Sequence, residues 1–150
     1  MTEQNPVALT EGECGALRLP VPAGEPKFIV GTHGQVLQWV GDGRTLIALT
    51  VTVRRQTRMT SPFALRNHLS WELDRLAERM EGELRREEPG VDSESSTPEG
   101  TIDGHREGLD THNRVLVSTD GQDMYIVHVM VTDTDAGRAL AGEVLAGVGF

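Results

Sequence analysis

The sequence predicts an α+β fold on a mainly antiparallel sheet of six to seven strands, with one long central helix and a second helix at the C-terminus. Three observations predict this fold class. Short stretches of alternating apolar and polar residues, joined by glycine turns, occur before residue 55 and again after residue 100. Apolar residues recur with helical spacing after residue 61 and again at the C-terminus. The connections leave no room for repeated crossovers between parallel strands, so neighbouring strands are expected to be antiparallel.

The length of the chain indicates one domain. It has 150 residues, enough to bury a core of its own. Residues 1–15 are polar, and we expect a loose N-terminal arm there. Residues 16–150 are expected to form a single α+β domain. Within it, residues 87–100, EEPGVDSESSTPEG, are acidic and rich in Ser, Pro and Gly, which predicts a mobile loop.

Strands are predicted on both sides of this loop. The stretch LRLPV, residues 17–21, suits an edge strand because its proline cannot donate to a central ladder. Residues 27–55 contain three strand-like runs separated by THG and GDG, which are hairpin signals. In the third run, one apolar face is expected to hold Ile47, Leu49, Val51 and Val53. Asp120-Gly121 predicts a further hairpin near the C-terminus.

Two amphipathic helices are predicted. The first begins with Ser61 as the N-cap and Pro62 at the first helical position. Its apolar stripe, expected to run for about five turns, consists of Leu65, Leu69, Leu73, Leu76, Met80 and Leu84. In the closing helix, Thr132 and Asp135 have capping-box spacing. Its apolar side holds Ala136, Leu140, Val144 and Val148.

The charge of the chain limits the classes of partner that it can bind. The formal net charge is −9, which disfavours nucleic acid and anionic membrane surfaces as partners. Residues 54–86 hold eight arginines against five acidic residues, a net charge of +3 that leaves −12 for the rest of the chain. The single cysteine, Cys14, excludes an intrachain disulfide and a cysteine-rich zinc site. No secretory signal and no apolar stretch of membrane-spanning length is visible, so a cytoplasmic protein is expected.

Catalytic and cofactor motifs are missing from the sequence. It has no P-loop, nucleophile elbow, zinc-protease motif or dinucleotide fingerprint. His105 and His112, with Asp103 or Asp110, match no standard zinc spacing, and solvated surface histidines are the favoured interpretation. His128 lies within a strand and is expected to be a hydrogen-bonded core histidine. We therefore predict no enzyme, no cofactor and no metal.

One aromatic residue departs from the apolar pattern of the long helix, since Trp71 falls almost opposite the leucine stripe. A Trp exposed among polar groups is typical of an interface hot spot, so a protein-binding surface is predicted there. The predicted interface residues are Trp71, Arg75, Asn67, Phe63, Arg66 and Arg58. Arg54 and Arg55 lie just upstream of them. The alternative is that the N-terminal arm or the 87–100 loop covers Trp71.

The order of elements over residues 16–150 resembles the Mog1/PsbP-like fold family, including its actinobacterial LpqN-type branch. The resemblance is carried mostly by GTIDGHREG, residues 100–108, and by NRVLVSTDGQDMYIVHVMVTDTDAGRALAGEVLAGVGF, residues 113–150. It implies an α/β/α sandwich around a central antiparallel sheet. It also implies a non-catalytic accessory or adaptor protein that binds another protein. No site residues transfer from the family, because its members differ widely in their partners.

The leading hypothesis is thus a small cytoplasmic protein-binding module with a protein partner, for which homodimer formation is also considered. One alternative is a small acidic secretion chaperone, although such proteins usually begin with a helix and this chain is expected to begin with strands. Another is a small-ligand-binding protein with a pocket between the sheet and the long helix, near His128 or Tyr125.

Overall fold

The computed structural model describes residues 7–31, 34–55 and 60–150, and these form two helices and nine strands. The helices are α1 (Pro62–Ala77) and α2 (Asp135–Ala146). The strands before α1 are β1 (Leu9–Cys14), β2 (Leu17–Pro22), β3 (Lys27–Gly31), β4 (Gly34–Val40) and β5 (Leu46–Arg54). The strands after α1 are β6 (Glu81–Glu87), β7 (Glu99–Arg106), β8 (Leu109–Thr119) and β9 (Met124–Thr132).

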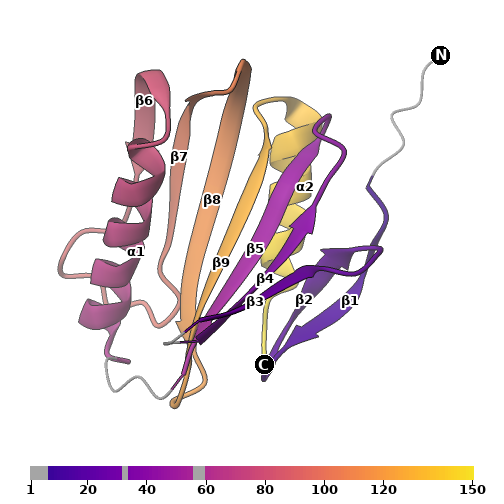
Figure 1. Ribbon diagram of the computed structural model, residues 1–150. Coiled ribbons are helices and arrows are strands. Elements are labelled where there is room, and N and C mark those ends of the chain that lie inside the picture. The colour runs from indigo at the N-terminus through magenta and orange to yellow at the C-terminus, as the bar shows by residue number, and fades with distance from the viewer. Residues whose placement is uncertain (1–6, 32–33, 56–59) are drawn as a thin grey trace.

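Seven strands form one antiparallel sheet in the order β3-β4-β5-β9-β8-β7-β6, and β1 and β2 form a separate hairpin. Figure 1 shows α1 on one face of the sheet and α2 on the other. The contacts agree, because α1 packs on β7 and β8, whereas α2 packs on β9, β8 and β2. The predicted α+β sandwich on an antiparallel sheet is confirmed.

The core has two layers, one on each face of the sheet. In β9, Tyr125, Val127 and Val129 face the α2 layer, and the alternate residues Met124 and Ile126 face the α1 layer. This alternation follows from the two-residue period of a strand. On one face α2 packs on both β8 and β9, and on the other α1 packs on β8, with Met124 and Ile126 of β9 in the same layer. These two strands are therefore buried along most of their length. They are the centre of the fold.

The predicted apolar face of β5 is confirmed with one shift. Leu49, Val51 and Val53 are buried together on the α2 side. Leu46 joins them in place of Ile47, because the pairing of β5 with β9 shifts register between Leu46 and Ala48. Such a bulge exchanges the faces of the residues before it. The predicted hairpin at Asp120-Gly121 joins β8 to β9, and residues 32–33 of the predicted THG turn lie outside the described residues.

The N-terminal arm expected over residues 1–15 differs in the structure. Residues 9–14 form β1, which pairs along its whole length with β2, and residues 1–6 lie outside the described residues. The polar composition of β1 concealed this strand, since its contact with the core is limited to Leu9, Gly12 and Cys14. A side chain at Gly12 would collide with Val21, with a Cβ only 2.6 Å from its Cγ2. Close packing therefore replaces apolar side chains there.

The long helix is shorter than predicted. It ends at Ala77, and the last two positions of the expected stripe lie outside it. Met80 still packs against the α1 core, whereas Leu84 lies in β6 and is 37% exposed. Gly82 has φ +76°, a left-handed conformation that suits glycine and interrupts helical geometry. The charged residues 81–87 instead form the edge strand β6.

The acidic loop is also shorter than predicted, because Glu87 belongs to β6 and Glu99 to β7. The start of the loop is held against α1, where Arg66 Nε donates to the carbonyl oxygen of Pro89 at 2.9 Å. In α2, the N-cap is Thr134, whose hydroxyl accepts from the Gly137 amide at 3.0 Å, in place of the predicted Thr132. Thr132 donates instead to the Arg44 carbonyl.

The end of α1 yields a direct test. We expect Leu73→Ala to lower the free energy of unfolding by about 2–5 kcal/mol, because Leu73 is fully buried between α1 and the sheet. Leu84→Ala should cost less than about 1 kcal/mol, because Leu84 lies outside the helix and is partly in water. Urea unfolding of both variants measures the difference. Similar losses at the two positions would contradict the helix end at Ala77.

Candidate functional site

The α1 face of the sheet is only partly covered. Because α1 packs over β7 and β8, no helix of the described residues lies on the same face of β3, β4 and β5, as Figure 1 shows. A groove with a volume of about 500 Å³ lies there, between α1 and β3. Its floor consists of Val36, Gln38, Ala48, Thr50, Thr52, Ile126, His128 and Met130. Its wall on the helix side consists of Glu72, Arg75, Leu76 and Arg79.

Strand alternation makes the floor of this groove. In β5, the large apolar residues face α2, so the shorter Ala48, Thr50 and Thr52 face the opposite side. Gln38 donates to the Thr50 hydroxyl at 3.3 Å and satisfies one polar pair of the floor. Short side chains, some polar and some apolar, therefore form this part of the floor.

Arginine dominates the charge of the groove. Arg54, Arg75, Arg79 and Arg106 line it, with Glu72 as the one acidic residue among its described lining residues. Arg75 pairs with Glu72 at 3.6 Å. Burial raises the pKa of Glu72, and the nearby arginines oppose this shift. This positive groove lies in a chain whose net charge is −9.

Trp71 lies beside the groove and is 47% exposed. Its ring lies between two arginines of the groove lining, with the Arg75 Cζ 4.9 Å and the Arg54 Cζ 5.7 Å from its centroid. The ring of His68 lies 5.8 Å away, tilted by 54°. Cation–π contacts of this kind help to hold the indole in place while about half of the side chain stays exposed. In the described part of the chain, neither β1 nor the 88–98 loop covers Trp71.

The structure brings together four of the six predicted interface residues. Phe63, Asn67, Trp71 and Arg75 are exposed and spaced four residues apart on α1, so they form one ridge, here called the α1 ridge. Arg66 is not part of the ridge, because it binds the loop through Pro89 and pairs with Glu88 at 3.6 Å. Arg58 lies outside the described residues. The sequence alternative placed a pocket between the sheet and the long helix near His128, where the groove lies, but it did not predict that Arg79 and Arg106 line it.

Two buried polar atoms near Trp71 lack hydrogen-bond partners among the described residues. They are Nε of Arg54 and Nε2 of His68. Burial, with the nearby Arg54 charge, lowers the pKa of His68. A buried donor without a partner costs free energy that a bound acceptor can recover. Both atoms lie beside Trp71, at the end of the groove that Arg54 lines.

His128 lies on the groove floor and is neutral. Its Nε2 is 2.8 Å from Oδ1 of Asn113. The Asn113 amide nitrogen donates to the Ile102 carbonyl and to the Thr111 hydroxyl, so Oδ1 accepts and His128 Nε2 carries the proton. Burial, followed by the charges of Arg106 and Arg79, lowers the pKa of His128 from 6.5 to about 4. The prediction of a hydrogen-bonded strand histidine agrees with this geometry.

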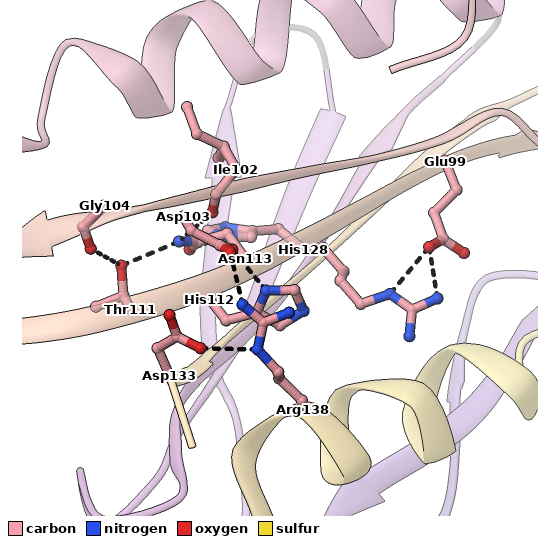
Figure 2. A network of polar contacts seen from close by, with 11 residues as sticks. Glu99, Ile102, Asp103, Gly104, Thr111, His112, Asn113, His128, Asp133 and Arg138 are labelled. Carbon is pink, nitrogen blue, oxygen red and sulfur yellow. Dashed lines mark hydrogen bonds and ion pairs between the residues drawn. The ribbon is translucent and has the colours of Figure 1, made fainter. Parts of the chain in front are cut away.

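The remaining histidines of β7 and β8 form structural pairs. His112 is buried, and its Nδ1 lies 2.6 Å from Asp103 Oδ1. Figure 2 shows Asp103 also bound to Arg138 of α2, whose Nε donates to Asp133 at 2.7 Å. His105 pairs separately with Asp110 at 3.0 Å. Within the described residues no group of His, Cys, Asp and Glu is arranged to hold a metal ion.

The His112–Asp103 pair therefore fixes α2 against the sheet. Arg138 crosses from α2 to the β7 carboxylate at 2.6 Å, and Arg114 Nε binds Glu99 at 2.9 Å on the same side. A histidine oriented by a carboxylate is one part of a nucleophilic triad, but no Ser, Thr or Cys hydroxyl or thiol is hydrogen-bonded to His112 in the described part of the chain. The contacts of His112, Asp103 and Arg138 instead connect α2 to the sheet.

The neutral His128 generates a test on pH. An unfolded histidine takes up a proton near pH 6.5, whereas folded His128 does so only near its lowered pKa of about 4. Protonation of the unfolded state therefore lowers the free energy of unfolding as the pH falls between these values, by about 3 kcal/mol at its fullest. His128→Gln, which keeps a donor for Asn113, should lose this component, measured by urea unfolding at pH 7 and pH 4.5. Equal changes with pH in both proteins would contradict the lowered pKa.

Comparisons with known proteins place the fold. No protein-family model and no curated protein sequence matches the chain. The crystal structure of the Saccharomyces cerevisiae Ran-binding protein Mog1p is similar with a TM-score of 0.57 and 14% identity, over 95% of both chains. A structure of a point mutant of the protein Mog1 is similar with a TM-score of 0.58, 14% identity and the same coverage. Cyanobacterial PsbP from Synechocystis has a TM-score of 0.49 and 11% identity, over 99% of this chain and 96% of that chain.

These similarities show the fold alone, because the identities are low. The chain has the Mog1/PsbP-like fold that the sequence resemblance predicted. Membership in the LpqN-type branch stays a prediction. No helix in the described residues is both long enough and apolar enough to cross a membrane.

Proposed function

We propose that this protein is a non-catalytic accessory module that binds another protein through the α1 ridge and the adjoining groove. The observation that carries the proposal is the 47% exposure of Trp71 between the side chains of Arg54 and Arg75. Tryptophan and arginine are the residue types most enriched at the energetic centre of protein interfaces. Both are already ordered here by their mutual contacts, which lowers the entropy lost on binding.

The surroundings of the α1 ridge support a protein partner. Phe63 is 59% exposed at one end of the ridge, and the arginine groove begins at the other. The fold is also compatible, since Mog1p, which shares it, is described as a Ran-binding protein. That description belongs to Mog1p. For this chain, the kind of partner is inferred from the surface of the chain itself.

Two alternatives compete with this proposal. A small-ligand site would use the groove at His128, but it leaves the exposed Phe63 and Trp71 of the ridge without a role. Tyr125 does not line the groove, since its hydroxyl lies on the α2 side between the Ala16 amide and Asp120. A secretion chaperone stays a prediction, and so does the cytoplasmic location expected from the sequence.

Trp71→Ala is the decisive variant. We expect affinity purification of the tagged protein from its own cells to recover a partner that the variant loses, with affinity reduced by about tenfold or more in titrations of the purified pair. Stability should change little, because half of the indole is in water. Val91→Ala, on the exposed part of the 88–98 loop, is the matched control and should keep the partner. A partner retained equally by wild type and Trp71→Ala would refute the proposal.

We further propose that the considered homodimer forms through β3. This strand is the open edge of the sheet, and Phe28, Ile29 and Val30 are 57%, 60% and 71% exposed. The opposite edge, β6, carries charged residues and a register shift, which are features that prevent edge pairing. A two-fold axis at Ile29 would place Phe28 opposite Val30 of the second copy, an aromatic and β-branched pair.

Val30→Lys should convert the dimer to a monomer, because a lysine on an open edge disfavours strand pairing. Light scattering coupled to size-exclusion chromatography measures the mass over a range of concentrations. Glu83→Lys places the same side chain on the β6 edge and should leave the dimer unchanged. A wild-type protein that is monomeric at all concentrations would end this part of the proposal.

A further inference from the structure

We propose that the groove between α1 and β3 binds an acidic amphipathic helix of the partner protein. This inference rests on the proposed function and deepens it by naming the chemistry of the partner. The helix would lie beside α1 with its apolar side on the sheet. Its carboxylates would face the arginines of the groove.

The size of the uncovered sheet suits one helix. From β3 to β9 the uncovered face spans three strand spacings, about 14 Å. An α-helix with its side chains has a diameter of about 10–12 Å. Sheets of sandwich folds bury their apolar side chains under helices, and here no helix of the described residues packs over Val36 and Ala48.

Charge selects an acidic partner. Arg75 lies near the end of α1 and Arg79 in the turn that follows it, and both line the groove. Arg106 lines the groove as well, near His128. The side chains of Arg79 and Arg106 form no ion pair or hydrogen bond with the residues that the structure describes. Most of the positive charge of the groove is thus uncompensated from within. A partner with several carboxylates on one side would supply counter-charges for these arginines.

The Trp71 end of the groove adds a second observation. Arg54 Nε is buried and lacks a hydrogen-bond partner among the described residues. A carboxylate satisfies a guanidinium better than a neutral acceptor does, because the hydrogen bond is charge-assisted. Arg54 also contacts the Trp71 ring, so a bound carboxylate would sit directly beside the hot-spot residue. The groove and the α1 ridge are therefore one continuous surface.

The test uses the full chain and a labelled peptide of about five helical turns, with Leu on one face and Glu on the other. We expect saturable binding by fluorescence anisotropy, weaker at high salt, and shifts of the His128 ring resonances in NMR spectra. Replacing every Glu by Lys keeps the apolar face and should abolish binding. A Glu peptide broken by two central prolines should also fail, because it cannot form the helix.

Charge reversal in the groove locates the site. The double variant Arg79→Glu/Arg106→Glu should lower the affinity for the Glu peptide by about tenfold or more. It should leave the fold intact, since neither arginine pairs with a described residue. The matched control, Arg44→Glu/Arg85→Glu, makes the same change of charge outside the groove and should bind as the wild type does. Circular dichroism confirms that each variant is folded.

In the peptide experiments, three outcomes would overturn the inference: no binding of the Glu peptide, equal binding of the Lys or proline-broken peptide, or equal losses in the groove and control variants. None of these touches protein binding at the α1 ridge, which Trp71→Ala tests separately. If the groove variant still captures the cellular partner while Trp71→Ala does not, the protein-binding role stands and the acidic helix is wrong.

Discussion

The pairing of β8 with β9 is the constraint on which the rest of the structure depends. Both strands lie in the middle of the sheet, and their side chains are buried on both faces. Each face therefore requires a cover. The α2 layer, together with the β1–β2 hairpin, covers one face, and α1 covers the other over β7 and β8. Because α1 ends at Ala77 and is centred on that side, the remaining strands keep an open face. The groove is a consequence of this unequal cover.

The boundary between the covered and open parts of the sheet holds the unusual polar groups. His128 lies there and is kept neutral by burial and by two arginines. Asn113 connects it to β7 through the Ile102 carbonyl, as Figure 2 shows. A polar network of this kind is stable only when its members are hydrogen-bonded. On the α2 side the Asp103–His112–Arg138 contacts serve a different purpose, because they attach the closing helix to the sheet.

The fold and the surface charge of the molecule give different information about its partner. The fold is shared with Mog1p at 14% identity, and a fold does not determine which partner is bound. The surface of this chain is distinctive, because arginines gather in one groove of an otherwise acidic protein. Acidic surroundings repel an acidic partner at long range, whereas the groove attracts it at close range. Such an arrangement favours specificity over unselective adhesion.

The sequence by itself determined the order and type of most elements, since periodicity is a local property. Alternation predicted the strands from β2 to β5 and β8 to β9, and helical spacing predicted the start of α1 at Ser61. It also singled out Trp71, because the position of a residue on a helical wheel depends only on its neighbours. Local reasoning failed where two periods competed, at Met80 and Leu84, and where close packing replaced apolar side chains, at Gly12.

Only the tertiary structure decided where the layers stop. Whether α1 covers the whole sheet or half of it depends on contacts between residues far apart in the chain, which no local pattern encodes. The gathering of Arg54, Arg79 and Arg106 in one groove has the same origin, since these residues come from β5, the turn after α1 and β7. The exposure of Trp71 could be predicted from its own helix. The groove beside it required the placement of that helix on the sheet.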